Sequence, residues 1–383
     1  MILHVIDNMF PEAGGPTSVV LELAHHQALM GQKVAVLCSY GPRKPEQRMA
    51  LEERWRGCGI EFLEIGSESR ARRAHAVREV IDRLNPEIIH IHCVWESIVR
   101  HAALHARKRR IPYVLSTHGM LHPYALAQKR LKKWVYLQVF SSILAGASEL
   151  YSINKEESDY VSRRFRRPSS VLANGIVVTD YERADSKAFL ANYPALAGRD
   201  FVLFVGRLHP IKGIDLLTRS FAHARKRGMK LDLVIVGPDY GARAGVEALT
   251  RELGIEQSVH FTGGLFGEEK LGAFAACTIF AHRPRFEGFG ITVVEGLASS
   301  KPVVTTKECK LDGAVEAGAL FQVADTDEGF GDALYEIVTS ADSGRALGAR
   351  GQSWARSMFD WESVTRRVDA SYRKVIALAP TAH

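Results

Sequence analysis

The stretch DFVLFVGRLHPIKGIDLLTRSFAHARKRGMKLDLVIVG, residues 200–237, decides the fold. Two short apolar runs, DFVLFVG and MKLDLVIVG, flank a loop that ends in glycine and a segment whose apolar residues recur with helical spacing. A continuous apolar run of this length is typical of a parallel strand that is buried on both faces. The stretch therefore predicts a strand–helix–strand unit of a doubly wound sheet.

The start of the chain has the same order. ILHVID leads through a loop that contains glycines to the helical segment PTSVVLELAHHQALMG and the apolar run QKVAVLCS. Two such starts within 383 residues predict two α/β domains. We place these domains at residues 1–178 and 179–360, and we expect a last helix, 361–378, to pack back onto the first domain and complete it. Further predicted strands are 59–65, 87–94, 112–117, 257–263, 277–283 and 301–306, and further predicted helices are 71–84 and 98–109.

The composition is that of a soluble globular protein, with 46% apolar and 24% charged residues. There is no apolar run of about eighteen residues, and the opening MILHVIDNMF has no basic leader, so we expect a cytoplasmic protein. The cysteines are scattered without a C-x-x-C pair, which argues against a disulfide framework or a zinc site. They are Cys38, Cys58, Cys93, Cys277 and Cys309.

Positive charge is concentrated in the first half of the chain. Residues 1–180 contain 25 Lys and Arg against 18 Asp and Glu, whereas residues 181–383 contain 25 of each. The span 97–148 has nine basic residues and no acidic one. Such a span suits an anionic membrane surface, and the alternative is a merely solvated face. We expect no nucleic-acid partner, because no recognition motif accompanies the charge.

Within this span, HPYALAQKRLKKWVYLQVF, residues 122–140, is typical of a basic amphipathic helix that lies on a membrane. The alternative is that its apolar residues pack into the core. On helical spacing, one broad side carries Lys129, Arg130, Lys132 and Lys133, and the other largely carries Leu131, Trp134 and Val135.

Two loops that follow predicted strands carry the charged residues. In an open α/β sheet, ligands bind beyond the carboxyl ends of the strands. GRLHPIKG, which begins at Gly206, offers Arg207 and Lys212 to a polyanion. RFEGFGITVVEGLASSKPVV, residues 285–304, places glycines before a helix start, where N–H groups favour an anion. The chemistry this suggests is departure of a diphosphate, whose charge would be neutralised without a metal ion by the two cations and the N–H groups of Gly290, Ile291 and Thr292.

The second loop also holds two carboxylates, Glu287 and Glu295. A carboxylate beside a bound phosphate would repel it, so we expect these groups to accept hydrogen bonds from sugar hydroxyls. An alternative for Glu295 is a capping box with Thr292, three residues earlier, in which it only closes a helix end.

Isolated glycines and histidines are weaker candidates. Gly14 and Gly15, at the first strand–helix turn, allow close backbone approach, although glycines there are more often conformational. His118 follows PYVLST, where a lone histidine is more often structural. His90 and His92 alternate on one strand face with a metal-like spacing but no third ligand, which favours core packing over a metal.

VGRLHPIKGIDLL together with RPRFEGFGITVVEGLASSKPVV resembles the retaining nucleotide-sugar glycosyltransferases of family four, which have the GT-B fold. The resemblance extends over essentially the whole chain, including the glycines at 14–15, STHGM at 116–120, NGI at 174–176 and the helix that contains WESV. It implies an α/β protein of two Rossmann-like doubly wound parallel-sheet domains that face each other across a cleft. The first domain would serve the acceptor and the second the nucleotide-sugar donor.

The resemblance also implies a role for each candidate residue. Glu295 would bind the ribose hydroxyls of the nucleotide, and Glu287 would bind the donor sugar. The remaining assignments are Arg207, Lys212 and the backbone at Gly206 for the diphosphate, Gly14 and Gly15 for the phosphate and acceptor side, and His118 for the donor sugar.

The activity implied is transfer of a sugar from a nucleotide-diphosphate donor to a glycan or lipid-linked sugar acceptor. The transfer would retain the anomeric configuration, need no metal or other cofactor, and use a front-face displacement assisted by the diphosphate. Bacterial relatives that build surface polysaccharides or glycolipids are the obvious comparison, which suggests a peripheral position on the inner face of the membrane. Two alternatives stay open: a GT-B-fold nucleotide-sugar epimerase, and a nucleotide-sugar-binding regulator without turnover.

The sequence departs from the family pattern in one motif, and it contains an aspartate pair that resembles a metal-binding motif. Asn-Gly-Val-Asp is common in the family, whereas here Gly175 is followed by Ile176 and Val177. Asp325 and Asp327 imitate a metal-binding Asp-x-Asp pair, but they stand where a helix should start. An N-cap role therefore explains them better than a metal does.

Overall fold

The computed structural model describes residues 1–10, 15–41, 44–66, 70–172 and 174–379. The chain forms two compact units. One combines Met1–Gly175 with the segment from Trp361 onward, and the other is Ile176–Asp360. The first boundary thus lies after residue 175, slightly before the expected position at 178.

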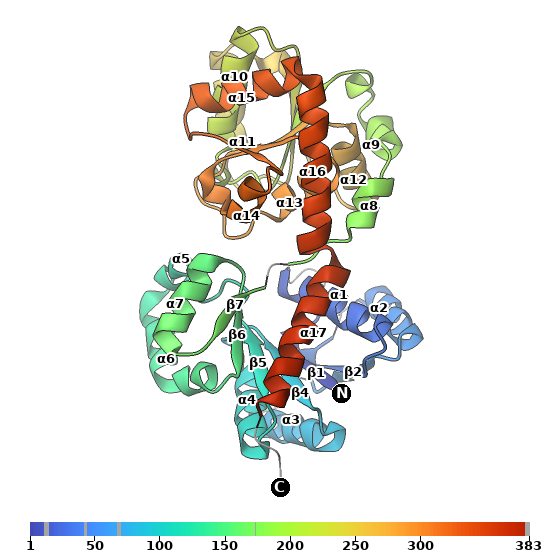
Figure 1. The fold of residues 1–383 in the computed structure, drawn as a ribbon, viewed down its shortest axis with the longest axis vertical. Coiled ribbons are helices and arrows are strands. Elements are labelled where there is room, and N and C mark those ends of the chain that lie inside the picture. The colour runs from blue at the N-terminus through green and yellow to red at the C-terminus, as the bar shows by residue number, and fades with distance from the viewer. Residues whose placement is uncertain (11–14, 42–43, 67–69, 173, 380–383) are drawn as a thin grey trace. The chain divides into compact units, whose positions relative to one another are not determined.

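The N-terminal unit is built on a seven-stranded parallel sheet with the order β3-β2-β1-β4-β5-β6-β7 (Figure 1). Strand order reverses direction between β1 and β4, as it does in a doubly wound fold. Its strands are β1 (Ile2–Asn8), β2 (Val34–Tyr40), β3 (Glu61–Glu64), β4 (Ile88–His92), β5 (Tyr113–Ser116), β6 (Glu149–Ser152) and β7 (Ser169–Val171). Its helices are α1 (Gly15–Leu29), α2 (Pro45–Gly57), α3 (Arg70–Leu84), α4 (Ser97–Arg109), α5 (Pro123–Ala127), α6 (Arg130–Ala145), α7 (Lys155–Phe165) and α17 (Trp361–Ala377).

The two faces of this sheet differ in chemistry. Leu3 and Ile89 point to the face covered by α3 and α4 and belong to the largest apolar core of the unit. The next residue along each strand points to the opposite face, and there His4 pairs in register with His90. Helices α1 and α17 cover this second face, which therefore buries histidines where a Rossmann-like sheet usually buries aliphatic side chains.

The C-terminal unit contains a six-stranded parallel sheet with the order β10-β9-β8-β11-β12-β13. Its strands are β8 (Phe201–Val205), β9 (Asp232–Val236), β10 (Val259–Gly263), β11 (Ile279–His282), β12 (Val303–Thr305) and β13 (Phe321–Gln322). Its helices are α8 (Val178–Arg183), α9 (Lys187–Asn192), α10 (Ile214–Lys226), α11 (Arg243–Glu252), α12 (Gly267–Ala276), α13 (Ile291–Ala298), α14 (Asp312–Glu316), α15 (Asp327–Thr339) and α16 (Ala341–Phe359).

Strand order in this sheet reverses between the adjacent strands β8 and β11. The loops that leave their carboxyl ends hold GRLHPIKG and the glycines at 288–290, so both candidate loops lie at the switch point where such folds bind ligands. Gly213 joins the first loop to α10 with φ of 63°, and a Cβ there would lie 2.0 Å from the Arg283 carbonyl oxygen. Only glycine fits that turn.

Helix prediction was wrong in one place. The segment 122–140 is not one helix, because Lys129 has left-handed backbone (φ 52°) and separates α5 from α6. The apolar residues expected to lie opposite the basic ones are exposed: Leu131 by 76%, Trp134 by 58% and Val135 by 47%. The alternative that Leu131 and Trp134 pack into the core is therefore wrong. Among the described residues, no helix is long and apolar enough to cross a bilayer.

Candidate active site

The loop after β8 holds Lys212 against Glu287. Residues Pro210–Lys212 form a short 3-10 turn, capped by the His209 side chain, which accepts a hydrogen bond from the Ile211 N–H at 3.2 Å. This turn directs Lys212 so that its Nζ donates to Glu287 Oε2 at 2.6 Å. Arg207, at the start of the loop, is exposed and lies over the ring of Tyr240. One cation of the predicted pair is thus fixed, and the other faces solvent.

Glu287 is a buried carboxylate with two donors. Its side chain is 8% exposed, and Oε2 also accepts from His282 Nε2 at 2.9 Å, at the end of β11. Burial alone would raise the pKa of Glu287, but His282 and Lys212 outweigh burial and hold that pKa below its ordinary value. Glu287 is therefore an anion near neutral pH, and its negative charge is shared with both partners.

Helix α13 follows the glycines and begins at Ile291, with Gly290 as its N-cap. The N–H groups of Val293 and Val294 bond to the Gly290 carbonyl, and the described hydrogen bonds include no backbone acceptor for the Thr292 N–H. Gly290 has no side chain that could cap this helix end, and the described residues provide no side-chain cap hydrogen bond there. The capping box of Thr292 with Glu295 is therefore wrong, because Thr292 lies inside the helix rather than at its N-cap.

Glu295 lies on α13 and has one satisfied oxygen. Oε1 accepts from Lys270 Nζ, on α12, at 2.7 Å. Oε2 is buried and meets no donor in hydrogen-bond geometry among the described residues. Tyr181 lies beside this carboxylate, and burial together with the Glu295 side chain raises its pKa, but its hydroxyl does not meet the geometry of a hydrogen bond to Oε2. A buried carboxylate oxygen without a donor is costly, and a hydroxyl of a bound ligand would satisfy it.

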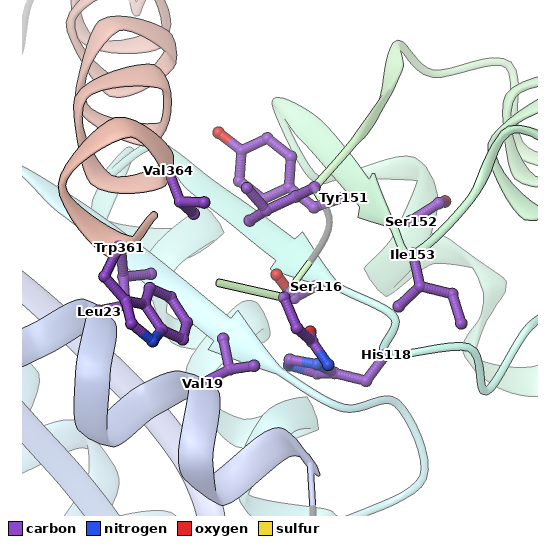
Figure 2. Close-up of a pocket in the computed structure, with 11 residues that line it drawn as sticks. Val19, Leu23, Ser116, His118, Tyr151, Ser152, Ile153, Trp361 and Val364 are labelled. Atoms are coloured by element: carbon purple, nitrogen blue, oxygen red, sulfur yellow. The ribbon is translucent and has the colours of Figure 1, made fainter. Parts of the chain in front are cut away.

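The N-terminal unit brings His118 to a pocket at the carboxyl end of β5. Figure 2 shows Ser116 and His118 with Trp361 of α17 and Val19 of α1 on one side and Tyr151 on the other. His118 has φ of 50°, and burial lowers its pKa to about 4, so the imidazole is neutral at physiological pH. The structure begins α1 at Gly15, whereas Gly14 lies outside the described residues.

The prediction that His90 and His92 have no third potential ligand was wrong. His4 lies beside them, and one ligand atom from each of the three rings falls within 4.8 Å of the others. Both ring nitrogens of each histidine already have hydrogen-bond partners, so the cluster is satisfied without an ion. The signal that the sequence analysis missed is ILHV at the first strand, which puts His4 in register with His90.

Asp325 and Asp327 both serve a buried arginine. Arg283 Nε donates to Asp325 Oδ1 at 2.8 Å, and its Nη1 donates to Asp327 Oδ1 at 2.5 Å. The N-cap of α15 is Thr326, whose Oγ1 accepts from the Gly329 N–H. The N-cap explanation for this segment thus falls on the threonine, and the two carboxylates balance Arg283.

The two glutamates were predictable from their motif, but not all the groups beside them. Lys270 and Tyr181 beside Glu295, and His282 beside Glu287, were not predicted. Lys270 lies in an ordinary charged helix start, so no local pattern distinguished it. His282 ends a strand five residues before Glu287, which is the one local signal that could have revealed it.

Both units match protein-family models. Residues 14–175 match the glycosyl transferase 4-like domain, and residues 186–354 match glycosyl transferases group 1. The two doubly wound sheets define the GT-B fold. The chain belongs to the family-four type of GT-B glycosyltransferases.

Relatives support the family at low identity. The MMP alpha-(1->4)-mannosyltransferase of Mycolicibacterium hassiacum is 33% identical over 44% of this chain and 41% of its own length. The GDP-mannose:cellobiosyl-diphosphopolyprenol alpha-mannosyltransferase of Xanthomonas oryzae pv. oryzae is 23% identical over 98% and 97%. HepE from Anabaena, solved with UDP and glucose, has a TM-score of 0.71 at 18% identity over 97% and 99%. The matched part spans 41–61% of the length of the first curated relatives.

Proposed function

We propose that this protein transfers a sugar from a nucleotide-diphosphate donor to a glycan or lipid-linked acceptor, with retention and without a metal ion. The observation that carries the proposal is Glu295, a buried carboxylate with one oxygen unpaired, on the helix that follows the switch-point glycines. Two adjacent ribose hydroxyls are donors of the kind this oxygen lacks. Glu287, on the same loop, would accept from the donor sugar.

The leaving diphosphate would be neutralised by groups of the C-terminal unit. Lys212 has three N–H donors, of which the contact with Glu287 uses one, so it can bind phosphate while keeping Glu287 in place. Arg207 is exposed at the loop start and the Thr292 N–H lies at the helix end, where an anion is favoured. These groups could supply the charge for which other transferases use a divalent cation.

The state of Glu287 bears on how a retaining transfer would proceed: it favours a front-face displacement over a double displacement. A carboxylate shared between Lys212 and His282 is a weak nucleophile, which disfavours a covalent glycosyl intermediate on it. In a front-face displacement, the acceptor oxygen bonds to the anomeric carbon on the face from which the diphosphate departs. The carbon–oxygen bond to the diphosphate breaks, and the acceptor hydroxyl proton passes to the leaving phosphate oxygen.

The test is turnover with UDP-glucose and GDP-mannose as donor probes and octyl glycosides as acceptor probes. We expect release of the nucleotide diphosphate, an α-linked product from an α-linked donor by NMR, and equal rates with EDTA or Mg²⁺. A β-linked product would refute retention, and a rate that falls in EDTA would refute metal independence. Donor conversion without an acceptor and without nucleotide release would identify an epimerase, whereas binding without any conversion would identify a regulator.

Helix α6 supports a lipid-linked acceptor. Its solvent face exposes Leu131, Trp134, Val135 and also Val139, which is 62% exposed, while its buried face uses Leu137, Ile143 and Leu144. Arg130 and Lys132 flank the exposed stripe on either side, and Lys129 precedes it. An apolar stripe with basic flanks complements an anionic bilayer surface. Lys133 is not part of this surface, because its Nζ donates to the Ala125 carbonyl at 2.6 Å.

Binding by this surface is testable with vesicles of phosphatidylcholine and phosphatidylglycerol. The surface consists of Lys129, Arg130, Leu131, Lys132, Trp134, Val135 and Val139. Each basic residue near the surface contributes about 1 kcal/mol, so Lys129/Arg130/Lys132→Ser should weaken partitioning roughly a hundredfold. Leu131/Trp134→Ser should weaken it at high salt as well, since its contribution is not electrostatic. The control, Lys226/Lys230/Arg251→Ser, removes equal charge from exposed positions of the other unit. Equal sedimentation of all variants would refute membrane binding and leave a soluble acceptor.

A further inference from the structure

The buried histidines of the N-terminal unit form an ordered hydrogen-bonded chain. His4 Nδ1 lies 3.0 Å from His92 Nε2, and His92 Nδ1 lies 3.1 Å from His118 Nε2. At its far end, His4 Nε2 lies 2.7 Å from Gln27 Oε1, and Gln27 Nε2 donates to Asp369 Oδ1 at 3.1 Å. These hydrogen bonds therefore run from a carboxylate on α17 to His118. Figure 2 shows His118 in the pocket that it lines.

The carboxylate fixes the orientation of the first link. Both oxygens of Asp369 accept from side-chain amides, Oδ1 from Gln27 and Oδ2 from Gln32. Burial raises the pKa of Asp369, while the hydrogen bond from Gln27 and the charge of Arg373 oppose this effect. An ionised Asp369 only accepts, so the amide nitrogen of Gln27 faces it and the carbonyl oxygen of Gln27 turns toward His4. A carbonyl oxygen only accepts, so the Nε2 of His4 carries a hydrogen.

Each following link is then determined by the one before it. Burial lowers the pKa of His4 to about 4 and places the pKa of His92 well below its ordinary value, so each neutral ring carries one N–H. Since the proton of His4 is on Nε2, its Nδ1 must accept, and His92 must donate from Nε2. His92 Nδ1 then accepts from His118 Nε2. His118 is left with its proton on Nε2 and a lone pair on Nδ1.

His90 lies beside this chain without determining it. Its ring packs on His92 with 4.0 Å between centroids, and its nitrogens bond to the hydroxyls of Tyr372 and Ser116. A hydroxyl can donate or accept, so these contacts allow either tautomer. The hydrogen bonds of Gln27 allow only one direction. A carboxylate can only accept, so it must face the amide nitrogen, and the amide oxygen is left for His4.

We propose that Gln27, His4 and His92, anchored by Asp369, are positioning residues that hold His118 with its proton on Nε2, so that Nδ1 accepts a hydrogen bond from a hydroxyl of a bound sugar. This inference rests on the proposed function, since it assumes that a hydroxyl of the sugar reaches His118. A phosphate or carboxylate oxygen has no proton to donate and would be repelled by the lone pair. The hydrogen bonds from Asp369 to His118 thus favour a hydroxyl over an anion as the partner of His118 Nδ1.

The tautomer is measured on the ligand-free protein by NMR of ¹⁵N-histidine. We expect His118, identified by the loss of its signals in His118→Asn, to carry its proton on Nε2. A proton on Nδ1, or a mixture of both forms, would overturn the inference. So would stoichiometric zinc in the purified protein, because a metal would use the lone pairs that bind His4 to His92. Neither readout depends on turnover, so failure here and failure of the proposed function are distinguishable.

The second test reverses the direction of the hydrogen bonds that run from Asp369 to His118. In Asp369→Asn the anchor can donate as well as accept, so Gln27 can turn around and each histidine can shift its proton to Nδ1. We expect the Nδ1–H form of His118 to appear and kcat/KM for the better of UDP-glucose and GDP-mannose to fall about tenfold, the value of one hydrogen bond. Gln32→Leu is the matched control, since it removes the other donor to Asp369 but leaves the chain intact. Asn Oδ1 can still accept from Gln27, so Asp369→Leu, which removes the acceptor, is measured beside it; an unchanged tautomer in both variants would refute the anchor role.

Substitution of His118 separates its two nitrogens. The Asn Oδ1 can occupy the place of Nδ1 and accept, and Asn also tolerates the left-handed backbone at this position. Gln instead places its amide near Nε2 and leaves nothing at Nδ1. We expect His118→Asn to retain more kcat/KM than His118→Gln at equal melting temperature. Greater activity in His118→Gln would contradict a role for Nδ1 as acceptor.

Discussion

Glu295→Gln tests the nucleotide site with the least structural change. The substitution keeps the shape of the side chain but removes the charge, and the amide can accept with only one of its two terminal atoms. In the wild type, Oε2 is unpaired and the residue is 6% exposed, so a ribose hydroxyl would form a charge-assisted bond there. Such a bond contributes roughly 1.5–3 kcal/mol, which predicts a tenfold to hundredfold rise in the Kd for the preferred nucleotide diphosphate.

The assay is calorimetric titration with UDP, GDP, ADP and TDP, with the melting temperature measured without ligand. We expect one nucleotide to bind the wild type best and its affinity to fall in Glu295→Gln, while the lost contact with Lys270 costs about 1 kcal/mol of stability. Glu256→Gln, an exposed carboxylate of the same unit, is the control. Unchanged affinity together with a large loss of stability would refute the ribose role and make Glu295 a structural residue.

Three further predictions concern the loops and the histidines. Glu287→Gln should lower kcat about tenfold to a hundredfold while free nucleotide still binds, whereas Lys212→Ala should impair both; equal loss of nucleotide affinity in the two variants would contradict this separation. Gly213→Ala should destabilise the protein more than Gly228→Ala in urea unfolding, because both have positive φ but only the first Cβ would meet backbone. Because His4 has a pKa of about 4 when folded and about 6.5 when unfolded, the unfolded chain binds the extra proton, and His4 alone lowers stability by about 1.4 kcal/mol per pH unit from pH 6.5 toward pH 4. Burial also lowers the pKa values of His90, His92 and His118, so the measured decline should be steeper than this and should become shallower in His4→Gln.

The strands and loops with strong local patterns were predictable. The apolar runs that form β8 and β9 are buried along their whole length. A continuous apolar run is the sequence pattern of a strand that is buried on both faces. Strands β6, β7 and β13 were missed, because they are two to four residues long and β7 and β13 are largely exposed. Sheet neighbours, rather than their own sequence, define them.

The candidate site was predictable only where its residues are close in sequence. Glu287 and Glu295 share one motif, but Lys270 reaches Glu295 from a different helix and Asp369 reaches Gln27 across 342 positions. Pairings at that separation depend on the fold. The orientation of α6 could not be predicted either, since amphipathic spacing shows which residues share a face but not which face turns to solvent.

The assignment of α17 to the N-terminal unit has a consequence for biosynthesis. Residues 176–360 form a contiguous unit and can fold as soon as they leave the ribosome, whereas the first sheet lacks Asp369 and Tyr372 until α17 has been synthesised. The histidine face therefore closes only after the whole second unit has been made, although its strands precede that unit in the sequence. A stop codon before Trp361 would leave that face uncovered in a chain whose second unit is complete, and we expect such a truncated product to be recognised by the quality-control machinery of the cell rather than to accumulate.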